Sequence, residues 1–353
     1  MIMNLGEIFS GPGGLAFGAK QASCDGIEIR HRWANDIDES ACETYRRNIC
    51  PGSSDSVINA PVQSLNIKKL KPIDALVFGF PCNDFSVVGE QKGFDGKFGP
   101  LYSYGVKILN VHKPIWFLAE NVSGLQSAND GNAFKKILKD LEKAGNGYNI
   151  TAHLYKFEEY GVPQTRHRII IIGIDKSLNR IYKVPEPTTA LNMISAREAL
   201  EAPPIPDNAS NQEYTKQSSA VIERLKFIPP GENAWYAGIP KRLRLNVKGA
   251  KLSQIYKRLH PDKPAYTITG SGGGGTHVYH WSEPRALTNR ERARLQTFPD
   301  EFAFIGSKES VRRQIGMAVP PQAAKIIVTA VIKTLNGVTY NSVPAKWECN
   351  LES

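Results

Sequence analysis

A cysteine that directly follows a predicted buried strand is the first residue of chemical interest. Cys82 lies in the run GFPCNDFSVVG, just after the apolar stretch Asp74–Phe80. A cysteine in a protein core is usually inert, but the preceding Gly-Phe-Pro at the strand end positions Cys82 outward. A thiolate in such a place is a strong nucleophile when its surroundings favour the ionised form. Cys82 is therefore a candidate for covalent catalysis.

Further polar residues stand at the ends of other predicted strands. Glu120 ends the apolar run IWFLAE, where its carboxylate can act as a proton donor. The run QTRHR (164–168) opens the next apolar stretch, and its Arg166 and Arg168 are two apart, on one face of a strand. Each residue alone also fits a satisfied polar group at a strand end. Their order along the chain indicates a catalytic set.

A glycine-rich loop near the N-terminus has the composition of a ligand-binding turn. Gly11, Gly13 and Gly14 fall between the first predicted strand and the first helix. The spacing is not GxGxxG, and no lysine follows as it would in a phosphate-binding P-loop. Asp36 and Asp38 follow the second strand, where a carboxylate can bind ribose hydroxyls. These residues fit a nucleotide-like cofactor, either NAD or S-adenosylmethionine, and also an ordinary tight turn.

The elements that must position these residues alternate between short apolar runs and helical patterns. This alternation predicts an α/β fold with βαβ units on a parallel sheet, whose carboxyl edge would gather the candidate residues. The predicted strands are Leu5–Phe9, Ile29–Ala34, Asp74–Phe80, Ile115–Glu120, Ala152–Phe157 and Arg168–Ile174. The predicted helices between them are Gly13–Ala22, Glu39–Asn48 and Ala133–Lys143.

The second half of the chain is rich in proline and basic residues. We expect a first domain over 1–184, a smaller loop-rich domain over 185–284, and a return to the first domain over 285–340. Thr288 and Glu291 form a predicted capping box, and Gln322–Gly337 reads as a helix that packs on the large sheet. GSGGGG (270–275) reads as a loop of the smaller domain that faces a ligand.

Charge and cysteine content narrow the class of protein. The 353 residues include 44 basic and 34 acidic ones, a net charge of +10. Between Ala220 and Arg313 there are 17 basic and 8 acidic residues, so this stretch holds nine of the ten surplus charges, as expected for a surface that binds nucleic acid. Five cysteines without a CxxC pair argue against a zinc site or a disulfide framework. The absence of a long apolar run or a signal peptide predicts a cytoplasmic protein without a membrane segment.

The motifs, in their order along the chain, resemble those of the DNA (cytosine-5) methyltransferases of bacterial restriction–modification systems. The resemblance runs from Leu5 to Leu335 through FSGPGG, GFPC, ENV, QTRHR, a basic variable region and QIGMAVP. It implies a Rossmann-like methyltransferase sheet with a second, smaller DNA-recognition domain. It also implies that S-adenosylmethionine binds at Phe9, Ser10, Gly11, Pro12, Gly13, Gly14, Asp36, Ile37, Pro81 and Leu101, with no metal.

The same resemblance implies a covalent mechanism on a cytosine flipped out of duplex DNA. Cys82 would add to carbon 6 of the base and Glu120 would contact ring N3. Arg166 and Arg168 would bind the base carbonyl or adjacent backbone and hold Glu120 in place. We expect a monomer on double-stranded DNA, paired in function with a restriction endonuclease. The implied DNA-contacting residues are Ser86, Gln164, Lys241, Arg242, Arg244, Lys257, Arg258, Thr269, Gly272 and Gly273.

Three positions depart from the family pattern. Asn83 replaces the usual glutamine after the cysteine, Met317 replaces an asparagine near the C-terminus, and no acid stands at the third cofactor motif, around Asn59–Val62.

A non-catalytic DNA-binding regulator is an alternative that would explain the basic second half of the chain but not the candidate nucleophile. An NAD-dependent oxidoreductase would explain the sheet but not the charge, and an RNA cytosine methyltransferase is the closest competitor. The sequence does not reveal the recognition site.

Overall fold

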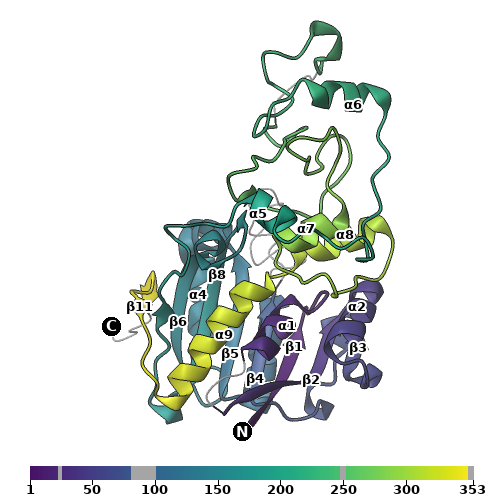
Figure 1. Cartoon of the computed structure of the whole chain (residues 1–353). Coiled ribbons are helices and arrows are strands. Elements are labelled where there is room, and N and C mark those ends of the chain that lie inside the picture. Colours follow the sequence, from purple (N-terminus) through teal and green to yellow (C-terminus); the bar gives the residue numbers. More distant parts are fainter. Residues whose placement is uncertain (23–25, 81–100, 247–251, 349–353) are drawn as a thin grey trace. The chain divides into compact units, whose positions relative to one another are not determined.

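The computed structural model describes residues 1–22, 26–80, 101–246 and 252–348, which form two compact units (Figure 1). Unit 1 comprises Met1–Phe157, His167–Thr188 and Pro321–Ser353. Unit 2 comprises Glu158–Arg166 and Thr189–Pro320. The chain therefore leaves unit 1 twice and returns to it twice.

Unit 1 is built on an eight-stranded mixed sheet. Across the sheet the strands are β12 (Trp347–Glu348), β6 (Tyr148–Lys156), β8 (His167–Asp175), β5 (Trp116–Val122), β4 (Ala75–Gly79), β1 (Ile2–Ile8), β2 (Glu28–Asp36) and β3 (Val57–Asn59). Strands β3, β2, β1, β4 and β5 pair in parallel, whereas β8 is antiparallel to both β5 and β6. The expectation of an all-parallel sheet is thus wrong for β8. Only residues 157–166 separate β6 from β8, too few for the crossover that a parallel pair requires.

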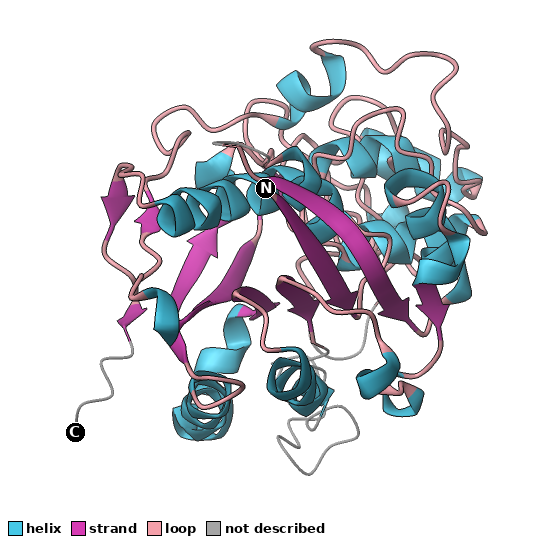
Figure 2. Ribbon diagram, turned by 90° about the horizontal axis from the view of Figure 1, so that it is seen from below, coloured by secondary structure: helices cyan, strands magenta, loops and turns pink. Residues whose placement is uncertain are grey.

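Helices cover both faces of this sheet (Figure 2). They are α1 (Gly14–Gln21), α2 (Glu39–Ile49), α3 (Tyr102–His112), α4 (Asn132–Glu142) and α9 (Pro321–Asn336). Gly18 of α1 lies so close to α9 that an added Cβ would meet the Pro321 carbonyl oxygen at 2.3 Å. On another side, Gly105 of α3 packs directly on the Phe78 ring of β4. The first contact packs α1 against α9, and the second packs α3 on the sheet, where Phe78 is part of the buried core.

The helical stretch Lys308–Asn336 is long and apolar enough, by length and composition alone, to cross a membrane. Its most apolar window is, however, 72% buried inside the protein. The part in α9 packs on α1, so its apolar side chains have a partner within the fold. This is the pattern of a core helix.

The C-terminal segment adds strand β12 to the outer edge of β6. Trp347 pairs with Ala152 in antiparallel register, and its ring packs edge-on against Phe134 at 5.0 Å. The Lys346 amide donates to Nδ1 of His153. A second short pair joins β9 (Val184–Pro185) to β11 (Ser342–Val343).

Unit 2 contains little regular structure. Its helices are α5 (Ala196–Glu201), α6 (Ser219–Lys226), α7 (Asn289–Leu295) and α8 (Lys308–Met317), and its strands β7 (Gln164–Thr165) and β10 (Ala265–Tyr266) pair in parallel. The predicted capping box of α7 is confirmed, since the Thr288 and Glu291 side chains each bond the other residue's backbone amide.

The second point at which the chain leaves unit 1, after Thr188, lies close to the predicted limit at 184, but residues 285–320 belong to unit 2. Arg290 explains this, because its guanidinium donates to the carbonyls of Ser210, Pro299 and Phe302 and so ties α7 to the loops around it. Loop carbonyls lack ladder partners, and buried arginines can satisfy several of them at once.

Candidate active site

The loop after β1 is held in a sharp left-handed turn. Phe9, Gly11 and Gly13 have φ values of 54°, 51° and 94°. A Cβ on Gly13 would approach the Tyr45 ring at 2.8 Å, so glycine is required there for space as well as for φ. Ser10 is 6% exposed, and its Oγ is buried without a hydrogen-bond partner in the described part of the chain.

Asp36, at the end of β2, fixes this loop. Its carboxylate accepts the Gly11 amide at 2.8 Å and the Asp38 amide at 2.9 Å. Burial raises the pKa of Asp36, and these two amide donors act against that rise. The next residue, Ile37, is 70% exposed, an unusual position for a large apolar side chain.

Asn59 is a positioning residue that the sequence analysis missed. Its side-chain amide donates to the carbonyls of Asp36 and Ile37, so it holds the backbone of both. The expected acid at this third motif is thus replaced by an amide that donates to backbone.

Glu120 and Arg168 form an ion pair, with 2.8 Å between Oε1 and Nε. Glu120 lies on β5 and Arg168 at the start of β8, where it is opposite Val122 in antiparallel register. The two side chains are 13% and 15% exposed. Burial lowers the pKa of Arg168, and the Glu120 carboxylate acts in the opposite direction.

The end of β4 lies directly beside this ion pair. Gly79 pairs with Glu120, and a Cβ on Gly79 would lie 3.0 Å from the Glu120 carboxylate. The Asn121 side chain donates to the Phe80 carbonyl at 3.1 Å, which anchors the residue that precedes Pro81 and Cys82 in sequence. Asn121 is a second positioning residue that the motif ENV contained but the sequence analysis left without a role. Pro81, Cys82 and Ser86 themselves lie outside the described residues.

Arg166 and Arg168 belong to different units of the protein and bind different partners. The strand is interrupted between Thr165 and His167, and Arg166 belongs to unit 2. It is 1% exposed, and its guanidinium donates to the carbonyls of Ile268, Gly316 and Ala318. The expectation that Arg166 holds Glu120 is therefore corrected: the ion pair of Glu120 is with Arg168.

Two residues expected to contact DNA are buried inside unit 2. Gln164 is fully buried; its amide donates to Leu295 and Gln296 and accepts from the Ile268 amide. Arg258 is 5% exposed and donates to four carbonyls, those of Leu225, Ile228, His280 and Glu283. In this structure both side chains bind groups inside unit 2, which charge and motif position alone could not reveal.

The other basic candidates remain accessible. Arg242 pairs with Glu223 and is 63% exposed, and Arg244 is exposed while it donates to the carbonyls of Ala237 and Ile239. Lys241 is also exposed, and Lys257 lies over the Tyr266 ring at 4.7 Å. In the glycine-rich loop Thr269 and Gly273 are exposed and Gly272 is half-buried. Leu101 caps α3 and is part of the unit 1 core.

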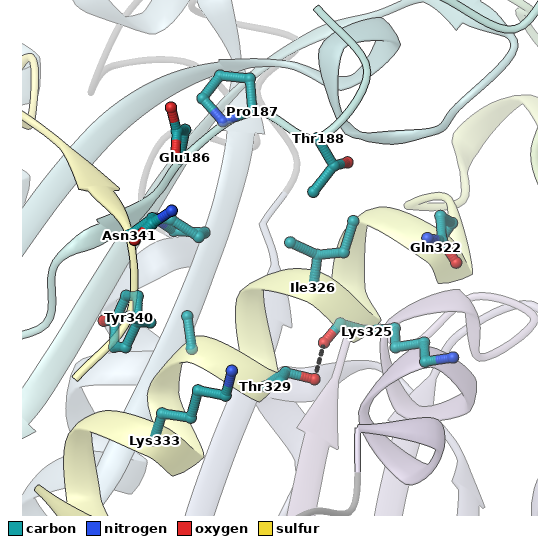
Figure 3. Close-up of a pocket in the computed structure, with 12 residues that line it drawn as sticks. Glu186, Pro187, Thr188, Gln322, Lys325, Ile326, Thr329, Lys333, Tyr340 and Asn341 are labelled. Carbon is teal, nitrogen blue, oxygen red and sulfur yellow. Dashed lines mark hydrogen bonds between the residues drawn. The ribbon is translucent and has the colours of Figure 1, made fainter. Parts of the chain in front are cut away.

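A groove of about 480 Å³ runs along α9, far from these residues in the sequence (Figure 3). It is lined by Lys325, Thr329 and Lys333 of the helix and by the segments 185–188 and 340–341. None of the predicted site residues lines it, so it is separate from the candidate site.

A family model for C-5 cytosine-specific DNA methylases matches residues 3–333. The chain belongs to this family. The methyltransferase is 60% identical to the Type II methyltransferase M.BbvI of Brevibacillus brevis, over 97% of this chain and 94% of that protein. It is 42% identical to the Type II methyltransferase M.NgoFVII of Neisseria gonorrhoeae, over 92% of this chain and 85% of that protein.

A solved structure supports the same assignment. The methyltransferase superposes with a TM-score of 0.73 and 26% identity on a prophage-encoded DNA modification methyltransferase from E. coli, covering 95% of this chain and 99% of the other. The predicted α/β methyltransferase sheet is confirmed. The methyltransferase is thus a DNA (cytosine-5-)-methyltransferase of the restriction–modification type, and DNA is its substrate.

Proposed function

We propose that this chain methylates carbon 5 of a cytosine flipped out of a short specific duplex sequence, through a covalent adduct of Cys82. The observation that supports this most is the Glu120–Arg168 ion pair beside the end of β4. A carboxyl group that is held by an arginine and is only 13% exposed is suited to bind one ring edge of a base. In the sequence, Cys82 follows the last residue of β4, Gly79, by three positions.

We infer that S-adenosylmethionine is the methyl donor. In the loop Phe9–Gly14, the buried Ser10 hydroxyl has no hydrogen-bond partner among the described residues. Asp36 provides a carboxylate for ribose hydroxyls, and Ile37 provides an exposed apolar surface for an adenine ring. These groups match the donor, acceptor and apolar parts of an adenosine. When bound, the cofactor supplies an electrophilic methyl group on a sulfonium. Phe9–Gly14, Asp36 and Ile37, with Pro81 and Leu101, would hold it.

The residues then act in sequence on the base. The Cys82 thiolate attacks carbon 6, and the electron pair of the carbon 5–carbon 6 bond moves to carbon 5. The protonated form of Glu120 would donate a hydrogen bond or its proton to ring N3, which limits negative charge on the ring, while Arg168 holds the carboxyl group in place. Carbon 5 would then take the methyl group, whose bond to the sulfonium sulfur breaks in the same step. Carbon 5 would lose its proton to a base, the bond between Cys82 Sγ and carbon 6 would break, and any proton on N3 would return to Glu120, which restores the thiolate and the aromatic ring.

The setting of this reaction follows from the restriction–modification assignment. We infer that methylation protects DNA from a cognate endonuclease and that the protein acts in the cytoplasm as a monomer on duplex DNA. The basic side chains of unit 2 would bind DNA phosphates, and its loops would contact base edges. The loop residues Thr269, Gly272 and Gly273 are among these expected contacts.

The test is transfer of a tritiated methyl group to duplex DNA, to RNA or to neither. Wild type should label duplex DNA only, and Cys82→Ser should abolish labelling while DNA binding persists. Duplex DNA containing 5-fluorocytosine should trap wild type in a covalent complex but not Cys82→Ser. Cys50→Ser is the matched control, because Cys50 is a buried free thiol away from these residues in the sequence. Normal turnover by Cys82→Ser would end the covalent mechanism.

A further inference from the structure

Arg292 and Arg312 of unit 2 each have a buried nitrogen without a hydrogen-bond partner in the described part of the chain. Arg292 of α7 is 1% exposed, yet its Nη1 has no hydrogen-bond partner within the described ranges. Arg312 of α8 is half-buried, and its Nε is likewise buried without a partner there. A buried guanidinium normally fills its donors, as Arg258 and Arg290 do in this unit.

Within the described residues, no acidic side chain forms an ion pair with Arg292 or Arg312, although the charge of Glu291 acts on Arg292 from a distance. Burial, followed by the nearby charge of Arg312, lowers the pKa of Arg292 to about 10. Burial and both arginines lower the pKa of His277 to about 4, so this imidazole is neutral at physiological pH and only meets Arg292 Nη2 at 3.5 Å. Glu291 is the nearest acid on α7, but its carboxylate is bound by Arg285 and the Thr288 amide. No ion pair reaches either arginine in the described part of the chain.

The glycine-rich loop lies directly on Arg312. The Arg312 Nη2 donates to the Gly272 carbonyl at 3.2 Å, and a Cβ on Gly272 would approach Nε at 2.3 Å. A Cβ on Gly273 or Gly274 would meet nothing within 4 Å, so the space beside these residues is open. The loop therefore has open space one or two residues beyond its contact with Arg312.

We propose that Arg292 and Arg312, with the loop Gly272–Gly274, form a binding site for a backbone phosphate of the substrate DNA. Arg312 would contact the phosphate oxygens, and Arg292 behind it would add a second positive charge in a medium of low dielectric constant. The anion removes the repulsion between the two guanidiniums, which nothing else in the described surroundings does. This inference rests on the proposed function, because that function makes unit 2 the surface that binds DNA.

The salt dependence of DNA binding tests the contact. Each phosphate neutralised in B-DNA contributes roughly 0.9 to the slope of log affinity against log salt. Arg312→Met should lower this slope by about that amount and weaken binding roughly tenfold or more at low salt. Arg197→Met is the matched control, since Arg197 is an exposed arginine of the same unit, paired with Asp262, and its loss should leave the slope unchanged.

Thermal unfolding provides a readout that a purely structural role would not produce. Replacing a buried, unpaired charge by an apolar side chain of similar size is often neutral or stabilising. Arg292→Met should therefore keep or raise the melting temperature of the free protein while it weakens DNA binding. A lower melting temperature with unchanged DNA affinity would overturn the proposal.

Inorganic phosphate distinguishes the source of the anion. Phosphate should raise the melting temperature of wild type but not of Arg312→Met, because a ligand that binds only the native state stabilises it. If phosphate acts this way while both variants keep the wild-type DNA affinity and salt slope, the site takes a free anion and the DNA assignment fails. If wild type itself methylates no duplex, the proposed function fails instead.

Discussion

Arg166 and Arg168 are separated by one residue and serve different parts of the molecule. Arg168 binds the Glu120 carboxylate in unit 1, whereas Arg166 binds three carbonyls in unit 2. The break in the strand between Thr165 and His167 makes this possible. At the scale of single residues, the two arginines should therefore fail in different ways when replaced.

Arg168→Met should lower turnover by roughly 10²–10⁴, the usual contribution of a positioned acid–base group, because Glu120 loses its partner. Glu120→Gln should do the same, with little change in cofactor affinity. Arg166→Met should instead destabilise unit 2 by about 3 kcal/mol, since three buried carbonyls lose their donors. Methyl-transfer rates and chemical unfolding of the two arginine variants check this. If Arg168→Met were unstable but turned over normally, Arg168 would have a structural role and not the role of positioning Glu120.

Glu7 of β1 is a buried carboxyl group whose titration should affect stability. It is 1% exposed, and burial raises its pKa to about 8; the hydrogen bond from Tyr45 acts against this rise, and the charge of Asp36 adds to it. The native state thus keeps a proton that the unfolded chain loses near the ordinary value of 4.5, so the free energy of unfolding falls as pH rises from about 4.5 to about 8. His31, with a pKa lowered to about 4 chiefly by burial, opposes this below pH 6.5.

Between pH 6.5 and 8 only Glu7 of this pair contributes, and Glu7→Gln should remove its effect. Over that interval we expect the variant to lose about 2 kcal/mol less stability than wild type. Denaturant unfolding at several pH values measures this. Glu43→Gln, on the exposed face of α2, is the control and should follow wild type.

At the scale of elements, the turn between β1 and α1 depends on Gly13 for conformation and for space. Gly13→Ala should cost more than the roughly 1–2 kcal/mol of a left-handed alanine, because the Cβ also meets the Tyr45 ring. Cofactor affinity should fall about tenfold or more, a change of at least 1.4 kcal/mol. Gly26→Ala is the control, since Gly26 has φ +76° and open space around it. Equal behaviour of the two variants would contradict the steric argument.

The elements show where sequence reasoning succeeds and where it ends. Apolar runs predicted β1, β2, β4, β5, β6 and β8 to within a few residues, apart from the start of β6, because burial on a sheet demands continuous apolar stretches. The three-residue β3 and the two-residue β12 have no such signal. The sequence also could not show that Gln164 and Arg258 turn inward, because the carbonyls they satisfy come from loops distant in the chain.

At the scale of the whole molecule, nine of the ten surplus positive charges come from the stretch 220–313, which lies within unit 2. Neutralising Lys241, Arg242 and Arg244 together should flatten the salt dependence of DNA binding by roughly one unit for each phosphate that these side chains no longer neutralise. Residues that bind base edges would instead alter which sites are methylated. Neutralising Lys68, Lys69 and Lys71 is the matched control, because these lysines are equally exposed but belong to unit 1. Equal slopes for the two triple variants would show that the basic segment is only a solvated face.

The short strand β12 has a consequence for how copies of the protein behave toward one another. It pairs with Thr151 and Ala152, in the middle of the outer edge of β6, and so interrupts an edge that would otherwise form an open template for strands of neighbouring molecules. The family match ends at residue 333, so this cover comes from the segment that follows it. A chain shortened before Trp347 would keep its catalytic residues and still tend to aggregate through the uncovered edge.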